Sequence, residues 1–328
     1  MPTPVIPSPP KSAFPRWKLP HLVKGTLTWI PILDAWRKRH ASAAGPESPT
    51  YCYAVWLRHL VLLHACGFQI DGVRVGELGP GNSLGTGLAS LLTGARYYVG
   101  LDVLPFSTKA NLLRIFADLV QKFSRKEPIP DDVDLPQVRP KLDSYRFPNH
   151  LIRWSDFSDR VEQIRGDLTR GINRGQLLHY HAPWTSLNGV AASSLDLVYS
   201  QSVLEHVDTL EGTYRTMFAW LKPGGYASHN IDFSAHYLSP FWNGHWAYSD
   251  REWWFVRGRR EFLLNREPLS THLEYAEKAG FEILLAKRDT ATDGLTPDML
   301  SLRFRALGPI DARTRSAFLV LRKPKAVK

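Results

Sequence analysis

The sequence predicts an α/β protein built around a mostly parallel sheet, and three observations indicate this fold class. From residue 73 onward, short runs rich in Val, Leu and Tyr alternate with stretches of helical periodicity, the pattern of repeated β-α-β units. A glycine-rich segment, residues 76–87, directly follows the first of these runs. The 328 residues, 44% of them apolar, suffice for one large core or two smaller ones.

Seven segments have the length and composition of strands. They are VRVGEL (73–78), RYYVGLDV (96–103), VEQIRGD (161–167), LDLVYSQS (195–202), GYASHNID (225–232), FEILLAKRD (281–289) and SAFLVLRK (316–323). Between them, one helix is predicted to begin at a cap by Asp208, and another at a capping box of Thr271 and Glu274, with Gly280 ending it. Residues 107–160 and 233–270 fit no such unit, so we expect two insertions that carry substrate specificity.

The start of the chain has its own character. Residues 1–45 contain seven Lys or Arg and one acid, which gives +6 of the formal net charge of +10. Two interpretations stay open: a solvated tail that leads to a docked helix, or contact with an anionic membrane surface. Residues 53–68 read as a packed helix, too short to span a bilayer. Residues 1–69 are therefore expected to form a basic, proline-rich tail with a helical extension, and residues 70–328 the main domain.

The compartment follows from what the sequence lacks. The N-terminal segment has no continuous apolar stretch of the secretory type, so the expected location is cytoplasmic, with peripheral contact at the inner membrane face as an option. The two cysteines, Cys52 and Cys66, show no metal-binding spacing and read as reduced thiols. The sequence indicates no oligomeric state.

The glycine-rich segment is the first indication of a ligand. Its spacing, Gly79-x-Gly81-x-x-x-Gly85, differs from the pattern that cradles a dinucleotide pyrophosphate, and it lacks the lysine of a phosphate-binding loop. Acidic residues stand at the ends of the neighbouring predicted strands. Asp102 ends the second strand, about 20 residues past the loop, where a carboxylate can accept both hydroxyls of a ribose.

These motifs, taken together, resemble one enzyme family. ELGPGNSLG, VGLDV, RGDL, LDLVYSQSVLEHV and LKPGGY, in this order and spacing over residues 70–323, are similar to class I S-adenosylmethionine-dependent methyltransferases, in a small-molecule or O-methyltransferase-like branch. The resemblance implies a Rossmann-like, doubly wound, seven-stranded sheet whose last strand is antiparallel and inserted between the fifth and sixth. S-adenosylmethionine would lie across the carboxyl ends of the first strands.

The resemblance also implies site residues. Glu77, Gly79 and Gly81 would surround the methionine part of the cofactor, Asp102 would bind the ribose, and Asp167, followed by the apolar Leu168, would bind the adenine. The full set of expected cofactor-binding residues is Glu77, Gly79, Pro80, Gly81, Asn82, Asp102, Val103, Asp167, Leu168, Ser200 and Gln201.

Methyl transfer to a hydroxyl needs a proton acceptor, for which a histidine is suited near neutral pH. The expected catalytic residues are His206 and Glu205, just past the fourth strand, and His236, past the fifth; His229 and Asp232 lie near them. His206 has an alternative role in ordering its loop. Some relatives hold a metal in this region, but Ser202 replaces the first acid of that pattern, so no metal is expected.

The sequence does not identify the molecule that would accept the methyl group. Aromatic residues and arginines of the 233–270 insertion fit either an acceptor site, for a small or glycan-type hydroxylated and possibly anionic molecule, or the core of a small lid. A nucleic-acid methyltransferase is an alternative that is disfavoured because the excess charge is concentrated in the tail. A further alternative is a non-catalytic binding protein, against which the intact glycine loop and Asp102 argue.

Overall fold

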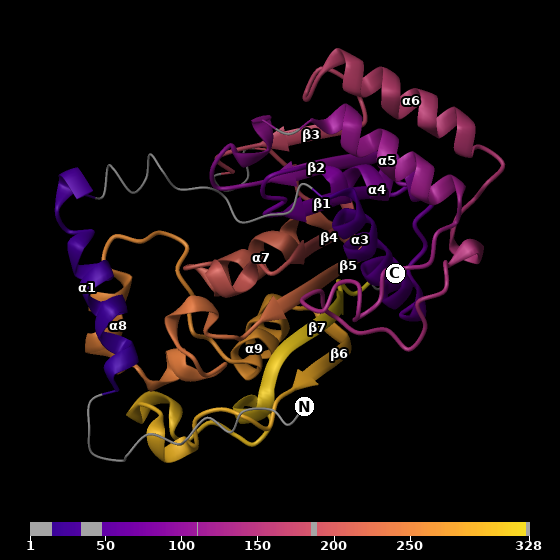
Figure 1. The fold of residues 1–328 in the computed structure, drawn as a ribbon. Helices are drawn as coiled ribbons and strands as arrows, with labels where there is room; N and C mark the ends of the chain where they lie inside the picture. Colours follow the sequence, from indigo (N-terminus) through magenta and orange to yellow (C-terminus); the bar gives the residue numbers. More distant parts are fainter. Residues whose placement is uncertain (1–14, 34–47, 110, 185–188, 326–328) are drawn as a thin grey trace. The chain divides into compact units, whose positions relative to one another are not determined.

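The computed structural model describes residues 15–33, 48–109, 111–184 and 189–325 (Figure 1). These residues group into two compact units. The larger unit combines residues 48–232 with 270–289 and 316–325, and the smaller combines residues 15–33 with 233–269 and 290–315. The proline-rich residues 1–14 and the whole basic cluster at 37–39, on which part of the tail prediction depends, lie outside the described residues.

The larger unit is built on a seven-stranded sheet with the order β3-β2-β1-β4-β5-β7-β6. The strands are β1 (Arg74–Leu78), β2 (Tyr97–Leu101), β3 (Leu178–His181), β4 (Leu195–Gln201), β5 (Leu221–Asp232), β6 (Glu282–Thr290) and β7 (Thr314–Arg322). Strands β1 to β5 pair in parallel, and β7 runs antiparallel to β5 (Figure 1). The predicted fold class, including the inserted antiparallel last strand, is confirmed.

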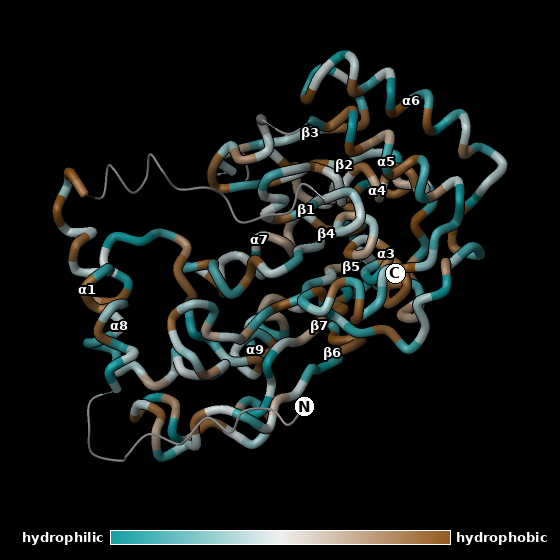
Figure 2. Tube along the Cα trace, in the orientation of Figure 1, coloured by the Kyte–Doolittle hydropathy of each residue, from teal (hydrophilic) through white to brown (hydrophobic). Residues whose placement is uncertain are grey.

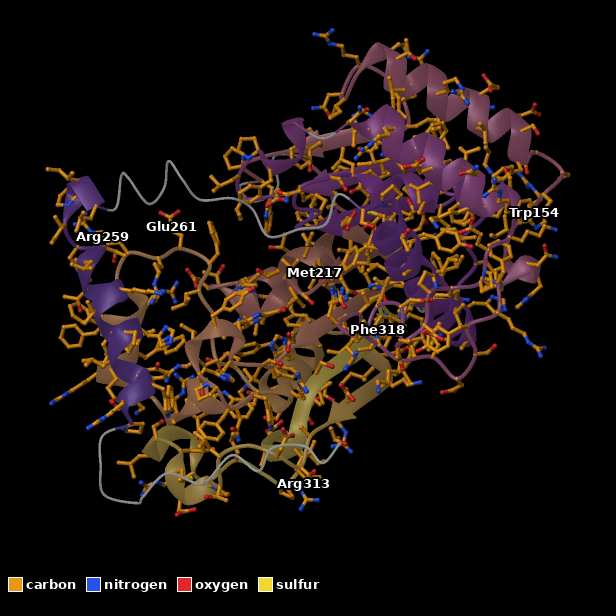
Figure 3. All side chains as sticks on the ribbon, viewed as in Figure 1. Trp154, Met217, Arg259, Glu261, Arg313 and Phe318 are labelled. Atoms are coloured by element: carbon orange, nitrogen blue, oxygen red, sulfur yellow. The ribbon has the colours of Figure 1, made fainter. Side chains whose placement is uncertain are left out.

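Helices cover the sheet. They are α3 (Pro49–Ala65), α4 (Gly85–Thr93), α5 (Leu112–Ser124), α6 (Phe157–Arg170), α7 (Leu210–Trp220) and α9 (Leu269–Ala279). One cluster of buried side chains joins α3, α4 and α5 to β1, β2 and β4, and Figure 2 shows the brown, hydrophobic segments meeting there. Phe318 of β7 belongs to this cluster, while Met217 is buried on α7, which packs against β5 (Figure 3). Strands with helices on both faces need apolar side chains on both faces, as β4 has.

The helix α3 was expected to belong with the N-terminal extension, but it is central to the larger unit. Tyr53, Trp56 and Leu60 are completely or almost completely buried, and the whole helix carries few exposed residues. Ser48 caps its first turn by accepting a hydrogen bond from the Tyr51 amide. The helix α3 is therefore part of the larger unit.

The prediction of a strand at residues 161–167 is wrong, because this segment is the middle of α6. Its buried residues Phe157, Val161 and Ile164 follow each other at helical spacing, which places them on one face of a helix. The third strand is instead the short Leu178–His181, whose polar composition gave no strand signal. The other six predicted strands are confirmed, with boundaries shifted by four residues or fewer.

The two predicted helix starts differ from those in the structure, whereas the predicted helix end at Gly280 agrees with it. The helix α7 begins after Thr209, which occupies the N-cap position in place of Asp208; α9 begins at Leu269, so Thr271 and Glu274 lie inside it rather than at its start. Gly280 ends α9 as predicted, with φ +100°.

The smaller unit contains α1 (Leu19–Leu27), α8 (Asp250–Arg257) and two small clusters of buried side chains. One cluster includes Tyr248, Trp253 and Val256, and the other includes Trp246 and Phe304. The helices α1 and α8 lie side by side (Figure 1). Within the described ranges, no helix combines the length and the apolar character required to cross a bilayer.

Candidate active site

The glycine-rich loop after β1 serves two structural purposes. Gly79 and Gly81 have φ of +62° and +70°, which side chains disfavour, so they make the turn. Gly87 lies further on, in α4, where a Cβ atom would come within 2.2 Å of the Tyr98 ring. Residues 79–82, which include Pro80 and Asn82, are half-buried, whereas the strand before them and the helix after them are buried. The turn is therefore the part of this segment that a ligand can reach.

Glu77 is buried directly before the turn. Its Oε2 atom accepts hydrogen bonds from the hydroxyls of Tyr98 (2.6 Å) and Tyr199 (2.7 Å). Burial raises the pKa of Glu77 to about 7; the two tyrosine hydrogen bonds oppose this, and the charge of Asp102 adds to it. Tyr98 can lie against α4 because Gly87 has no side chain. One oxygen of Glu77 is thus committed to the protein interior.

Asp102 stands at the carboxyl end of β2, 4% exposed. Its Oδ2 atom accepts a hydrogen bond from the Gly81 amide (3.1 Å), and its Oδ1 atom accepts one from the amide of Val103 (2.8 Å), which is half-buried. Burial raises the pKa of Asp102 to about 6, although hydrogen bonds from backbone amides oppose the rise. The carboxylate therefore joins the turn after β1 to the end of β2.

The side chains at the end of β4 point into the protein. Ser200 shares a 2.8 Å hydrogen bond between its Oγ atom and Nδ1 of His229. Gln201 contacts His59 through Oε1 (3.2 Å) and donates from Nε2 to the Arg139 carbonyl (3.1 Å). Of this pair, only the half-buried Gln201 keeps accessible surface at the sheet edge.

The reason for assigning Asp167 to adenine is removed, because Asp167 is in α6 and not at a strand end. Its carboxylate is 1% exposed and accepts hydrogen bonds from the amides of residues 176–178 and from Arg170. Burial favours a higher pKa for Asp167, but the hydrogen bonds outweigh it and the pKa is lowered. Asp167 therefore fixes the turn between α6 and β3, and Leu168 packs against the core beside it.

Sequence reasoning missed the segment that follows β3. The amide of Trp184 donates to the backbone carbonyl of Asp102 (2.8 Å), and the Asp102 amide donates to the His181 carbonyl (3.0 Å). Burial, followed by the charge of Asp102, raises the pKa of Tyr180. The signal that could have identified this segment is the run of aromatic and imidazole side chains in HYHAPW, residues 179–184.

Glu205 and His206 follow β4 in a short 3-10 helix, Leu204–His206. Glu205 is 3% exposed, and neither carboxyl oxygen completes a hydrogen bond within the described residues. Burial, with a smaller contribution from the charge of Asp232, holds the pKa of Glu205 well above its ordinary range. Burial thus disfavours the ionised form of this carboxyl group. His206 is half-buried.

The remaining candidate bases differ from His206 in exposure. His229 is completely buried, and burial lowers its pKa to about 3. His59 and His272, also completely buried, have pKa values lowered to about 4 and about 3 for the same reason. His236 is exposed and belongs to the smaller unit, where it has φ of +49°.

The aromatic insertion is largely the core of the smaller unit. Trp246, Tyr248 and Trp253 are at most 7% exposed, and the guanidinium of Arg266 lies 4.5 Å from the Trp253 ring centroid. Arg266 is itself buried and bonds the Tyr248 carbonyl and Asp250. Of the two interpretations of this insertion, the packed core accounts for most of its aromatic side chains.

Comparison with protein families identifies the central part of the larger unit. A family model described as a methyltransferase domain matches residues 161–228, which extend from α6 into β5. No curated protein matches the chain in sequence.

Several solved methyltransferases are similar to the chain. An S-adenosylmethionine-dependent methyltransferase from Mesorhizobium loti is 18% identical with a TM-score of 0.41, over 80% of this chain and 96% of that one. A phosphoethanolamine N-methyltransferase 2 from Haemonchus contortus, solved with phosphomonomethylethanolamine and S-adenosylhomocysteine, is 16% identical with a TM-score of 0.43, over 82% and 53%. A methyltransferase from Methanosarcina mazei is 13% identical with a TM-score of 0.42, over 80% and 97%.

Proposed function

We propose that this chain is a class I S-adenosylmethionine-dependent methyltransferase that methylates a hydroxyl oxygen of a small or glycan-type acceptor, with His206 accepting the hydroxyl proton. The methyltransferase domain and the strand order with its antiparallel β7 are the premise. The acceptor class and the roles of individual residues are the proposal.

The residues at the sheet edge fit the cofactor. Asp102 supplies a buried carboxylate that suits two ribose hydroxyls, and the turn at Gly79–Gly81 offers backbone beside it. Three carboxyl groups with raised pKa values, those of Glu77, Asp102 and Glu205, favour a positively charged ligand because a cation stabilises their ionised forms. The sulfonium of S-adenosylmethionine has that charge.

The adenine site is reassigned within the proposal. Since Asp167 is committed to its own turn, we place the adenine beside residues 181–184, where the His181 carbonyl and the Trp184 amide bond the backbone of Asp102. In a parallel sheet the carboxyl ends of neighbouring strands meet at one edge, so the base next to the ribose would contact the strand next to β2.

When bound, S-adenosylmethionine supplies a methyl group on a sulfonium, which leaves as a neutral thioether. The chain must then align the acceptor oxygen with the sulfur–carbon bond and remove the hydroxyl proton. The buried carboxyl of Glu205 can form a hydrogen bond with a polar group of the acceptor. Its two unpartnered oxygens are the buried polar atoms that an acceptor would satisfy.

The role of His206 as the proton acceptor is supported by a difference in solvent exposure between His206 and the other histidines near the sheet. His59, His229 and His272 are completely buried and their pKa values lie far below neutral, so they do not accept a proton from a bound ligand. His206 is half-buried, follows the carboxyl end of β4 and is adjacent to Glu205. Among these histidines of the larger unit it alone combines access with position.

The test compares His206→Ala and His206→Gln with His64→Ala, a control at another half-buried histidine. Formation of S-adenosylhomocysteine is followed with a panel of hydroxylated acceptors, sugars and phenols included. We expect both His206 variants to keep cofactor affinity and to lose about 10²–10⁴ in maximal rate, the usual contribution of a general base. The pH–rate profile should lose its acidic limb.

Two results would contradict the proposal. A His206 variant that keeps most of its rate leaves the residue as a loop-ordering group. A wild-type rate that collapses with chelator and returns with added Mn²⁺ or Zn²⁺ assigns Glu205 and His206 to a metal in place of the base role.

A further inference from the structure

The smaller unit carries an exposed apolar surface made of residues that the proposed reaction does not use. Of 16 large hydrophobic residues exposed in the described part of the chain, nine lie on α1, on the residues just after it and on α8. We call these nine the α1–α8 surface: Leu19, Val23, Leu27, Trp29, Ile30, Ile32, Leu33, Trp254 and Phe255. Their exposure ranges from 39% at Trp29 to 80% at Ile32. Figure 2 shows the brown, hydrophobic residues of α1 and of the turn that follows it.

The side chains of this surface are arranged together. Leu19, Val23 and Leu27 are four residues apart, which puts them on one face of α1. The ring centroids of Trp29 and Trp254 are 5.0 Å apart, and Phe255 meets Trp254 edge-on at 4.9 Å. Aromatic contacts therefore connect α1 and α8 on the exposed side. Contiguous exposed apolar groups of this kind mark interaction sites.

The opposite side of α1 is already used in packing. Gly25 is buried, and a Cβ atom there would lie 2.0 Å from the Phe255 carbonyl oxygen. Thr28 donates its hydroxyl to the Gly25 carbonyl (2.6 Å) and accepts from the Arg259 amide (2.7 Å). The two helices are thus fixed to each other, and their mutual packing does not account for the nine exposed side chains.

Positive charge surrounds the surface. Residues 15–33 contain no acid; Arg16 and Lys24 are exposed, whereas Lys18 is buried and paired with Glu252. Arg259 is exposed, with its guanidinium 5.4 Å from the Trp29 ring centroid, and Figure 3 shows it beside α1. Tryptophans next to cations, flanking an aliphatic face, are the composition of helices that lie in the headgroup region of a membrane.

We propose that the α1–α8 surface docks this methyltransferase on an anionic lipid bilayer, with the aliphatic side chains among the acyl chains and Lys24 and Arg259 at the phosphates. The charge selects this occupant: a second copy would bring the same cations together, and a neutral bilayer would leave them without partners. The proposal is independent of the acceptor and of the His206 role, since it concerns residues outside the sheet edge.

Point substitutions are the appropriate test, because deleting residues 1–45 would also remove α1 from α8. The purified full chain is sedimented with vesicles of phosphatidylcholine alone and of phosphatidylcholine with 30% phosphatidylserine, at low and high salt. We expect binding to the anionic vesicles only. Ile32→Ser and Val23→Ser should each reduce it about three- to tenfold, and Lys24→Gln with Arg259→Gln about tenfold or more.

The matched controls are Leu302→Ser and Ile310→Ser, which remove exposed apolar side chains of the same unit, 82% and 55% exposed, outside the α1–α8 surface. They should leave vesicle binding unchanged, and all variants should keep the wild-type cofactor affinity as a check of folding.

Several results would overturn the proposal. They are no sedimentation with either vesicle, equal binding to both, or equal losses in the control and surface variants. A wild type that is dimeric in solution, with Ile32→Ser monomeric and no vesicle binding, would assign the surface to a second copy. Capture of an acidic protein without any affinity for vesicles would likewise replace the bilayer.

Discussion

The sheet edge of the larger unit buries carboxyl groups, which are usually exposed, whereas the α1–α8 surface of the smaller unit exposes apolar side chains, which are usually buried. At the sheet edge, Glu77, Asp102 and Glu205 are carboxyl groups with at most 4% exposure, whereas on α1 and after it Leu19 and Ile32 are aliphatic side chains with 57% and 80%. Both arrangements cost free energy in the isolated fold. Under the two proposals, each region is completed by a different kind of partner, a charged small molecule in one and a lipid bilayer in the other.

The largest expected effect is on cofactor binding, which should depend on the sheet edge and not on the α1–α8 surface. Asp102→Ala should weaken S-adenosylmethionine binding by about 10²–10⁴-fold, because two hydrogen bonds to a charged acceptor contribute about 1.5–3 kcal/mol each. Titration calorimetry measures it, with Asp143→Ala, at a fully exposed carboxylate, as the control. Vesicle sedimentation should not change. Undiminished cofactor affinity would show that the carboxylate only ties the loop to β2.

Glu77 offers a test through stability. Its pKa is raised to about 7, so the stability that comes from its protonated form is fully present below the unfolded pKa near 4.5 and is lost as pH rises through about 7. The loss is at most about 3 kcal/mol. Glu77→Gln should remove this dependence, seen as a smaller difference between urea unfolding at pH 5 and at pH 8.

The buried histidines contribute the opposite slope, because their lowered pKa values take stability away as pH falls below about 6.5, but they do so equally in wild type and variant. Identical pH profiles for the two proteins would mean that Glu77 remains ionised within its tyrosine pair.

Gly25→Ala tests the close packing of α1 against α8 in the smaller unit. The added methyl group would meet the backbone carbonyls of α8, which cannot rotate away, so we expect about 1–3 kcal/mol of destabilisation, seen as faster proteolysis within residues 15–33. Vesicle binding should fall while cofactor affinity stays. Gly212→Ala is the matched control, since its Cβ in α7 has open space and should be neutral or slightly stabilising. Equal proteolysis of both variants would refute close packing of α1.

The smallest effect is the pH dependence of cofactor binding. The pKa of Asp102 is raised to about 6, and its ionised form accepts the ribose hydroxyls, so affinity should be constant above that pH and fall about tenfold per pH unit below it. Calorimetry in buffers of different ionisation enthalpy should show proton release on binding near pH 6. Affinity that stays flat down to pH 5 would place the pKa of Asp102 in its ordinary range.

Much of the fold was predictable because the signals were local. Six strands were identified from short apolar runs, and Asp102 from its distance to the glycine loop. The third strand was missed because Leu178–His181 alternates with histidines, and because the RGDL motif at 165–168 suggested a strand end where the spacing of Phe157, Val161 and Ile164 favours a helix. The periodicity was the better guide there.

The site was less predictable than the fold. Nothing in the sequence shows that the Asp167 carboxylate meets three amides of residues 176–178, since that contact depends on how the chain turns after α6. The raised pKa of Glu205 likewise comes from burial under a tertiary arrangement. The exposure of Ile32 and Trp254 could not be predicted from the sequence either. Composition alone does not show which apolar side chains of a segment pack against the protein and which face the solvent.

The pairing of α1 with α8 has a consequence for synthesis of the chain. About 220 residues separate Leu27 from Asp250. At a synthesis rate of roughly 5–20 residues per second, α8 leaves the ribosome about 10–45 s after α1 does. During that interval both faces of α1 are open to water, and the strands from β1 to β5 emerge before α8 does. The nascent chain therefore presents an apolar, cationic segment to chaperones, or to a nearby bilayer, well before the enzyme is complete.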